Sequence, residues 1–340
     1  MSWPIAATRV HCIVFELPAE AAREAILARL AREPDVLHAQ PLNTFVAAGA
    51  SGGYNDPYVD LQRSLQQMAI PAAHRWSRGS GVRVAVIDTG IDTRHPDLAG
   101  RVLSSRNFID RDRAQFDRDR HGTEVAGIIA ALADNSVGIV GVAPEVQVLA
   151  IKACWQLRSD ADEAVCNSFT LAQGLAAAID ARANLINLSV VGPSDPLLAD
   201  LISEAARRGI IVVGAAGFPG RASDVIAVDV ARPLSISVQH FYAPGDDILT
   251  LTPTGGYGFA SGSSLATAHV SGVVALLLSR NRHLPADEVR RLLSAATRRL
   301  STPLGDLQSI NACAALAQML GEGPCPEASQ IPAIAATEAE

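Results

Sequence analysis

The chain has 340 residues, 49% of them hydrophobic, which is enough for one large core and a small additional module. Its 28 basic and 35 acidic residues give a net charge of −7, and no Lys/Arg-rich run stands out, so neither nucleic acid nor an acidic membrane surface is an expected partner. The longest apolar stretches, residues 209–218 and 270–278, are too short to span a membrane, which indicates a soluble protein.

The first part of the chain is expected to form a small α/β module. Residues 10–17 are β-branched and apolar and predict a strand, residues 19–32 place apolar side chains at helical spacing, and residues 36–46 predict a second extended run. The module would cover residues 1–46, and the Gly- and Ser-rich residues 47–55 would form an exposed linker. The N-terminal residues show no basic start, no long apolar run and no cleavage site, so the sequence gives no indication of a signal peptide.

From residue 56 onward, predicted strands and helices alternate. Strands are predicted at residues 82–88, 146–153, 185–190 and 210–215, and helices at residues 123–132, 171–182, 196–208, 264–280, 287–300 and 309–320. This alternation is typical of an α/β fold with a mainly parallel, twisted sheet flanked by helices. The main domain is expected to cover residues 56–320, followed by a loose C-terminal tail at 321–340.

The five cysteines have an informative spacing. Cys154 and Cys166 are twelve residues apart, as are Cys313 and Cys325, while Cys12 stands alone. Two disulfides within residues 50–340 would suit an oxidising compartment, so a periplasmic or secreted location is expected. Five buried thiols remain the alternative, and the spacing does not fit a zinc knuckle.

Three polar residues lie at predicted element boundaries. Asp88 ends an apolar strand, His121 begins an apolar helix, and Ser264 begins another helix after a turn of small residues. Strand ends are common positions for catalytic groups in α/β sheets, and a helix start offers N–H donors to an oxyanion. Taken singly, each residue could instead serve as a cap or turn residue, and Ser263 is a second candidate nucleophile.

Three blocks of sequence carry a family resemblance. They read VAVIDTGID…HPDL from residue 84, HGTEVAG from residue 121 and GSSLATAHV from residue 262. The blocks resemble the signatures of the subtilase family, and the order Asp, His, Ser is that of subtilisin itself. Residues 55–58 and 133–139 look especially like the thermitase branch of this family. The resemblance covers about residues 56–279 and implies a serine endopeptidase that cuts polypeptides through Asp88, His121 and Ser264. A monomer is expected.

The resemblance also implies binding sites. One predicted strand would pair with the substrate backbone, and a second segment would form a wall of the specificity pocket. The residues concerned are Ser189, Val190, Val191 and Gly192 for the strand, and Ala215, Ala216 and Gly217 for the wall. Calcium is the implied cofactor, held by side chains of Asp56, Asp97 and Asn135 and by backbone carbonyls near Leu132, Val137 and Ile139.

Residues 9–46 resemble the latter part of a subtilase propeptide, a module that assists folding of the protease and blocks its cleft. The chain's own N-terminal module is therefore an expected partner. Self-cleavage is expected between Val46 and Asp56, where residues are small and flexible. A purely structural N-terminal cap is the alternative.

One position departs from the family pattern. Subtilases usually carry Ala-Ala-Gly-Asn, whose Asn side chain donates a hydrogen bond to the oxyanion, whereas this chain has Phe218 after Ala215-Ala216-Gly217. Phe218 cannot donate. Two hypotheses therefore stay open: an active, self-processing endopeptidase of reduced turnover, and a pseudo-peptidase that retains the cleft as a peptide-binding module. A nucleotide-binding domain is disfavoured because no glycine-rich phosphate motif is present.

Overall fold

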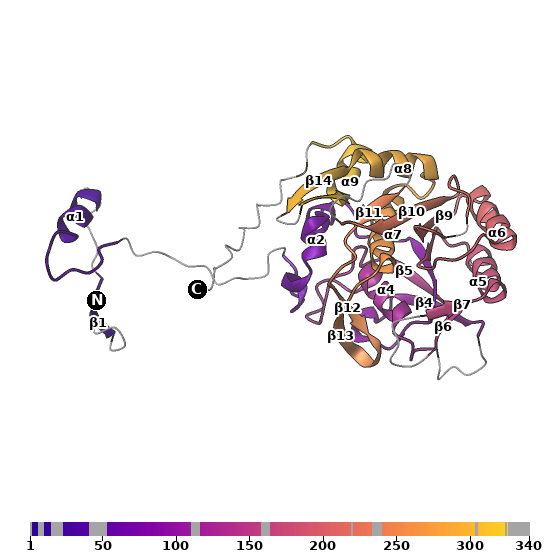
Figure 1. Cartoon of the computed structure of the whole chain (residues 1–340), viewed down its shortest axis with the longest axis horizontal. Coiled ribbons are helices and arrows are strands. Elements are labelled where there is room, and N and C mark those ends of the chain that lie inside the picture. Colours follow the sequence, from indigo (N-terminus) through magenta and orange to yellow (C-terminus); the bar gives the residue numbers. More distant parts are fainter. Residues whose placement is uncertain are drawn as a thin grey trace. The chain divides into compact units, whose positions relative to one another are not determined.

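The computed structural model describes residues 2–5, 10–14, 23–40, 53–109, 116–157, 164–218, 220–232, 240–302, 305–323 and 325. The chain divides into two compact units, residues 1–49 and 50–340 (Figure 1). Most of the predicted linker, and residues 326–340 of the predicted tail, lie outside the described residues. Tyr54 and Asn55 belong to the larger unit, because Tyr54 Oη contacts His74 Nδ1 at 2.6 Å and Asn55 Oδ1 accepts from the N–H of Ser136 at 2.7 Å.

The smaller unit contains one hairpin and one helix among its described residues. Strand β1 (Ser2–Ile5) pairs antiparallel with β2 (Val10–Ile13), and α1 spans Arg23–Leu30. The predicted strand and helix are thus present in part, whereas β1 was not predicted. The extended run expected from residue 36 is wrong for residues 36–40, which form no strand, and its remainder lies outside the described residues.

The larger unit is built on a seven-stranded sheet whose neighbouring strands are all parallel. The strand order is β11-β10-β9-β8-β3-β5-β4. In chain order the strands are β3 (Arg83–Asp88), β4 (Val102–Asn107), β5 (Gln147–Lys152), β8 (Leu185–Leu188), β9 (Ile211–Ala215), β10 (Val225–Val230) and β11 (Phe241–Ala243). The predicted α/β fold with a parallel sheet is confirmed, and its four predicted strands are β3, β5, β8 and β9.

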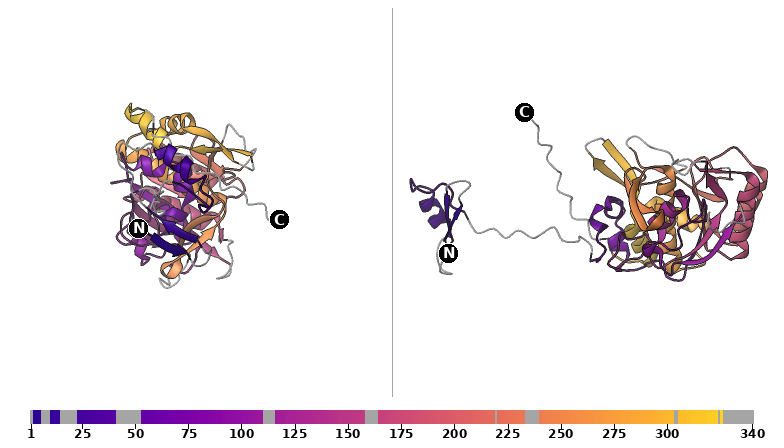
Figure 2. Two further views of the ribbon diagram at one scale, coloured as in Figure 1. Left: turned by 90° about the vertical axis from the view of Figure 1, so that its left-hand side faces the viewer. Right: turned by 90° about the horizontal axis from the view of Figure 1, so that it is seen from below.

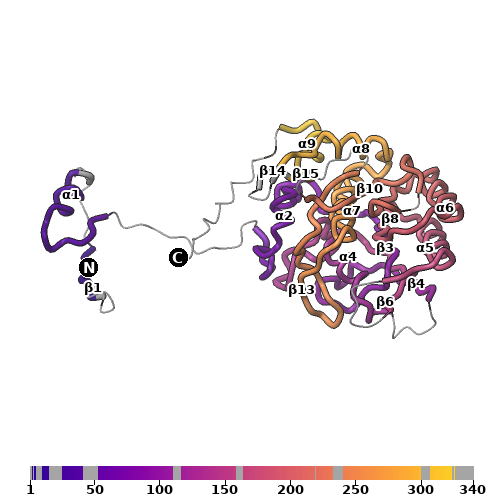
Figure 3. The backbone as a smooth tube through the Cα atoms, viewed as in Figure 1, coloured from indigo at the N-terminus to yellow at the C-terminus, as the bar shows by residue number. Residues whose placement is uncertain are grey.

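Helices cover both faces of this sheet (Figures 1 and 3). Helices α4 (His121–Ala130) and α7 (Ser263–Arg280) pack on one face, and α5 (Ser168–Asp180) and α6 (Pro196–Arg207) on the other. Alternate residues of β3 enter the two clusters: Val84 and Val86 lie with α4 and α7, and Ala85 and Ile87 with α5 and α6. Burial on both faces explains the continuous apolar run of the strand.

Smaller elements complete the unit (Figure 2). Three antiparallel hairpins are present among the described residues: β6 (Cys154–Gln156) with β7 (Ala164–Cys166), β12 (Ile248–Thr252) with β13 (Gly256–Ala260), and β14 (Thr297–Thr302) with β15 (Gly305–Ile310). The short helices are η1 (Val59–Leu61), α2 (Arg63–Gln67), α3 (Ile70–Ala73), η2 (Pro96–Leu98) and η4 (Pro253–Gly255), and α8 (Ala286–Ala295) and α9 (Ala312–Leu320) follow α7. The helix predicted for residues 287–300 is wrong beyond Ala295, because the chain from Thr297 pairs with β15.

Both expected disulfides are formed. Cys154 is bonded to Cys166, which closes the β6–β7 hairpin, and Cys313 is bonded to Cys325 at the C-terminal end of the unit. Cys12 is free and exposed. The alternative of five buried thiols is therefore wrong. Within the described residues, no helix is both long and apolar enough to cross a membrane.

Candidate active site

The predicted catalytic residues lie at the carboxyl edge of the sheet, where the strand order changes direction. From β3 the chain proceeds to β4 and β5 on one side, and then to β8 on the other side of β3. Crevices form outside the strand ends at such switch points. Asp88 is the last residue of β3, and Ser189 directly follows the adjacent strand β8.

Asp88 and His121 are joined by a hydrogen bond. Asp88 Oδ1 accepts the Nδ1–H of His121 at 2.8 Å and the backbone N–H of Thr89 at 2.6 Å. Because a carboxylate only accepts, the shared proton resides on Nδ1, and the Nε2 of a neutral ring keeps a lone pair. Asp88 is almost fully buried, so this hydrogen bond is shielded from water.

Glycines bring the strand end and the helix start together. A Cβ on Gly122 would lie 2.1 Å from the carbonyl oxygen of Gly90, and one on Gly90 would lie 2.0 Å from that of Phe116. Gly90 also has φ +99°, in the region that disfavours other residues. The N–H of Gly122 donates to Thr89 Oγ1 at 3.0 Å. This close approach explains why Asp88 and His121 are each followed so closely by glycine.

The surroundings of His121 favour its charged form. Burial lowers the pKa of the ring, but the charge and hydrogen bond of Asp88, with a smaller contribution from Glu124, outweigh burial and raise the pKa above its usual value of 6.5. Glu124 is buried one turn further along α4 and forms an ion pair with Arg120. A ring that is stabilised in this way is suited to hold a proton transiently.

Ser264 is the second residue of α7, and α7 packs directly against α4. The preceding Gly262 allows its hydroxyl to approach the backbone, since a Cβ there would lie 3.3 Å from Ser264 Oγ. The start of a helix supplies N–H groups without helical partners, as an oxyanion requires. Both α4 and α7 thus begin at this edge of the molecule with a candidate catalytic residue.

A buried polar bridge connects Ser264 to the sheet. Ser189 Oγ donates to the carbonyl oxygen of Ser264 at 3.3 Å and accepts from Asn187 Nδ2 at 2.9 Å, and Ser271 Oγ donates to Asn187 Oδ1 at 2.8 Å. Asn187 is fully buried and was not singled out from the sequence. Its one signal was an amide within an otherwise apolar strand, Leu-Ile-Asn-Leu.

The two segments expected to contact substrate lie next to each other. The N–H of Gly192 donates to the carbonyl oxygen of Gly217 at 3.4 Å, which connects the loop after β8 with the loop after β9. Ser189 and Ala215 are buried, whereas Val191 is 64% exposed. An exposed backbone next to a partly apolar surface is the kind of edge to which an extended peptide can add.

Phe218 does not face solvent. It is buried in the apolar cluster that contains Ile202 of α6 and Val225 of β10. That cluster packs on the face of the sheet opposite to α7, so the phenyl ring contributes to the core under α6. It supplies no hydrogen-bond donor at the position where the family carries asparagine.

Asp97 and Asn135, two of the predicted calcium ligands, are in contact. Asp97 Oδ1 accepts from Asn135 Nδ2 at 2.7 Å, and Asp97 Oδ2 accepts from the N–H of Ile139 at 2.9 Å and from Tyr257 Oη at 3.2 Å. The N–H of Leu132 donates to the carbonyl oxygen of Asp97 at 2.8 Å. Side chain and backbone of Asp97 thus hold both ends of the 132–139 loop.

Asp56 approaches the same loop. Its Oδ2 accepts the N–H of Asp134 at 2.8 Å, and its Oδ1 is buried without a hydrogen-bond partner. Asn135 Oδ1 accepts the N–H of Val137 at 2.9 Å. Burial raises the pKa of both Asp56 and Asp97, because it disfavours the carboxylate charge. Among the described residues, no cluster of three or more His, Cys, Asp or Glu side chains forms a metal site.

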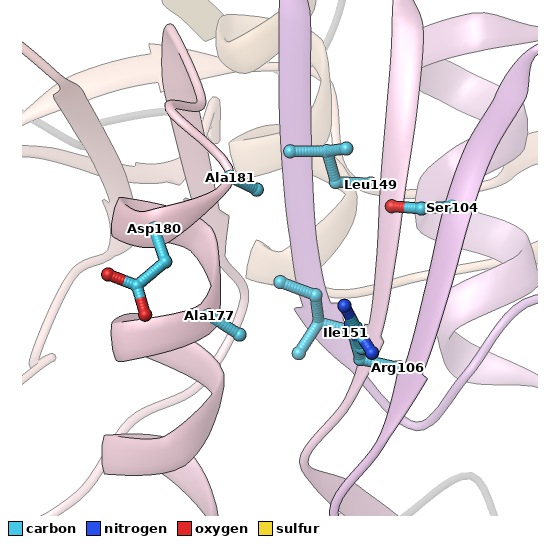
Figure 4. A pocket seen from close by; sticks show the side chains of 7 residues that line it. All are labelled: Ser104, Arg106, Leu149, Ile151, Ala177, Asp180 and Ala181. Carbon is cyan, nitrogen blue, oxygen red and sulfur yellow. The ribbon is translucent and has the colours of Figure 1, made fainter.

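A separate pocket lies between the edge of the sheet and α5 (Figure 4). Leu149 and Ile151 of β5 face Ala177 of α5 and Ala181, which directly follows α5, across it. None of the predicted catalytic residues lines this pocket. It is therefore not part of the candidate active site.

Comparisons with known proteins agree with this architecture. Residues 79–313 match the model of the Subtilase family. The chain is 37% identical over 246 residues to Thermitase of Thermoactinomyces vulgaris, covering 67% of this chain and 86% of that protein. It is 35% identical over 274 residues to an intracellular serine protease of Paenibacillus polymyxa, covering 73% and 82% of the two chains. A solved protease structure from Pseudoalteromonas arctica PAMC 21717 superposes with a TM-score of 0.67 at 25% identity, covering 78% of this chain and 99% of that one. The chain therefore belongs to the subtilase family and is a thermitase-like serine endopeptidase.

Proposed function

We propose that Asp88, His121 and Ser264 form the charge relay of this endopeptidase. His121 Nε2 accepts the hydroxyl proton as Ser264 Oγ attacks the scissile carbonyl, and Asp88 stabilises the imidazolium formed. The proton then passes to the leaving amine, and an acyl-enzyme ester remains on Ser264. A water molecule, deprotonated by His121, attacks this ester and releases the second product.

The hydrogen bond of 2.8 Å between His121 Nδ1 and Asp88 Oδ1 carries this proposal. It selects the ring tautomer in which Nε2 is free to act as a base. His121 lies in the first turn of α4 and Ser264 in the first turn of α7, and these two helices pack against each other. This packing supports Ser264 as the third residue of the relay.

Substrate is proposed to bind as an added strand along residues 189–192, with residues 215–217 forming one side of the specificity pocket. The adjacency of these loops through Gly192 and Gly217 supports this assignment. Such binding recognises the peptide backbone, so it suits polypeptide substrates of varied sequence.

A second candidate function is a pseudo-peptidase that binds peptides without cutting them. The specific observation in its favour is Phe218, which removes a side-chain donor from the oxyanion position. Backbone N–H groups at the start of α7 remain as donors. We therefore favour an enzyme of reduced turnover over a binding module.

A fluorophosphonate probe, which labels activated serine hydroxyls, distinguishes these functions. We expect the wild-type chain to be labelled at Ser264, Ser264→Ala to remain unlabelled, and the neighbouring control Ser263→Ala to be labelled as wild type. Peptide mapping by mass spectrometry locates the label. A folded wild-type protein without label would favour the binding module, and a label on Ser263 would contradict the assigned nucleophile.

We further propose that residues 1–46 act as an inhibitory and folding module, removed by self-cleavage between Val46 and Asp56. The proposal rests on the likeness of residues 9–46 to part of a subtilase propeptide. Cleavage at the same site in Ser264→Ala, detected by intact-mass measurement, would contradict an intramolecular origin.

The two disulfides support a periplasmic or secreted location. That the protein acts as a monomer stays a prediction.

Calcium is proposed to bind between Asp56, Asp97 and the 132–139 loop. The donors fit a hard cation, because they are carboxylate, amide and carbonyl oxygens, and because the buried Asp56 Oδ1 has no other partner. Asn135 and the carbonyls of Leu132, Val137 and Ile139 would complete the oxygen set. A bound calcium ion would compensate the buried carboxylate charge and connect residue 56 to the core.

Removal of calcium is expected to lower the melting temperature. A ligand present at 100 times its dissociation constant stabilises the folded state by about 2.7 kcal/mol, which corresponds to roughly 5–10 °C for a domain of this size. Calorimetry with and without chelator measures the shift. We expect Asp56→Asn to lose the response to chelator and the exposed control Asp180→Asn to retain it. An unchanged melting temperature of the wild type in chelator would refute the site.

A further inference from the structure

Lys152 is the only lysine in the 340-residue sequence; every other basic residue apart from histidine is arginine. It is the last residue of β5, and its side chain is 2% exposed. In the parallel pairing of β3 with β5, Lys152 is the register partner of Asp88. Paired residues of neighbouring strands project from the same face of a sheet, so Lys152 lies beside the proposed relay.

The ammonium group joins the two segments that carry Asp88 and His121. Lys152 Nζ donates to the carbonyl oxygen of Thr89 at 2.6 Å and forms an ion pair with Asp119. Thr89 directly follows Asp88, and its Oγ1 accepts the N–H of Gly122. Asp119 precedes His121 by two residues. One buried cation thus connects the end of β3 with the loop that leads into α4.

The site suits an ammonium better than a guanidinium. An ammonium is a compact charge, whereas a guanidinium has five N–H donors in a fixed plane that must all be satisfied. The stem of Lys152 also packs against backbone, since a Cβ on Gly90 would lie 3.4 Å from Lys152 Cδ. Asp119 is partly buried, so each charge depends on the other for compensation.

We propose that Lys152 and Asp119 are a positioning pair, which holds His121 in register with Asp88 and keeps the local charge balanced. This inference rests on the proposed relay. Neither residue is assigned contact with substrate. Their effect is exerted through the geometry and the electrostatic surroundings of the His121 ring.

Charge balance around His121 makes the inference measurable through pH. The charged groups that act on the ring are Asp88 from β3 and Glu124 from α4. Next to them, Lys152 of β5 pairs with Asp119 of the loop before α4, and Arg120, which directly precedes α4, pairs with Glu124. Loss of the Lys152 charge leaves Asp119 uncompensated, which favours imidazolium and raises the pKa of His121. Loss of the Asp119 charge leaves Lys152 uncompensated, which lowers that pKa. Simultaneous loss of both charges restores the balance.

The test compares Lys152→Met, Asp119→Asn and the double variant. We expect kcat to fall about 10²-fold in each, the scale of a small misplacement of a catalytic group, with KM changed little. The acidic limb of the kcat profile should move to higher pH in K152M, to lower pH in D119N, and return to the wild-type position in the double variant. The double variant also addresses the case in which an unpaired buried charge prevents a single variant from folding.

Arg298→Met is the matched control. It removes a half-buried cation that donates to the carbonyl oxygen of Gln67 at 3.0 Å from the β14–β15 hairpin. It should lower the melting temperature without moving the acidic limb. Wild-type kcat in the folded double variant, or limb shifts in the same direction in both single variants, would overturn the inference. Labelling of the wild type by the fluorophosphonate probe at Ser264 separates the two proposals. If the wild type is labelled, either of these outcomes refutes only the positioning pair. If the wild type is not labelled, the proposed relay itself is wrong.

Discussion

Replacing Asp88 by asparagine is expected to lower kcat by about 10⁴-fold, the scale known for the orienting aspartate of a serine protease relay. The amide keeps the shape of the carboxylate but cannot compensate an imidazolium. It can also donate to Nδ1, which would place the ring proton on Nε2 and remove the base. The loss is therefore expected in turnover, with the fold retained.

The same substitution should move the pH profile. Asp88 is the main group that raises the pKa of His121, acting against burial, which lowers it. In the wild type the acidic limb of kcat/KM should lie above pH 6.5, because activity requires the neutral ring and is lost as the pH falls through the raised pKa. Without the carboxylate, burial dominates and the limb moves to lower pH. Residual activity measured between pH 5 and 9 records both effects.

Asp92→Asn is a suitable control for this variant. Asp92 is a buried carboxylate on the same segment, which accepts from the N–H groups of Arg94 at 3.0 Å and Thr254 at 2.9 Å. Its loss should reduce stability and leave the acidic limb in place. An Asp88→Asn enzyme with wild-type kcat and an unmoved limb would contradict the assigned role of Asp88.

Replacing Phe218 by asparagine is expected to raise kcat by about 10²–10³-fold. The magnitude is that of one oxyanion donor, for which subtilisin is itself the reference system. An asparagine side chain is short enough to leave the cluster under α6 and turn toward the cleft. The additional donor then stabilises the charge that develops on the carbonyl oxygen in the transition state.

The gain in turnover should be accompanied by a loss of stability. Phe218 is buried with Ile202 and Val225, and truncation of a buried Phe costs about 3–5 kcal/mol. Phe218→Ala is the matched control, because it creates a similar cavity without an amide. Steady-state kinetics and denaturant unfolding of both variants separate the two effects. If F218N is no faster than F218A, the missing donor does not limit the enzyme.

The C-terminal part of the main domain illustrates a limit of sequence-based prediction. Residues 287–300 have the apolar spacing of a helix, and α8 follows that pattern to Ala295. From Thr297 the chain instead forms β14, which pairs antiparallel with β15, so that Thr297 lies opposite Ile310. Pairing between segments depends on which partner is available, and local periodicity does not record it.

The sequence by itself determined the alternation of strands and helices, four of the seven strands of the main sheet, the family, and the identity of the candidate relay residues. It could do so because a buried parallel strand requires a continuous apolar run, and because Gly90 and Gly122 tolerate no larger residue at the close approach beside Asp88 and His121. These requirements are local, so they appear directly in the motifs.

Only the tertiary structure decided which of two disulfide hypotheses holds, on which face of the sheet Phe218 packs, and that Lys152 connects Thr89 with Asp119. Each depends on segments far apart in the chain. A lone lysine at a strand end and an acid in a loop carry no sign that they are partners. Their relation arises when β5 is placed beside β3, where burial makes an uncompensated charge costly.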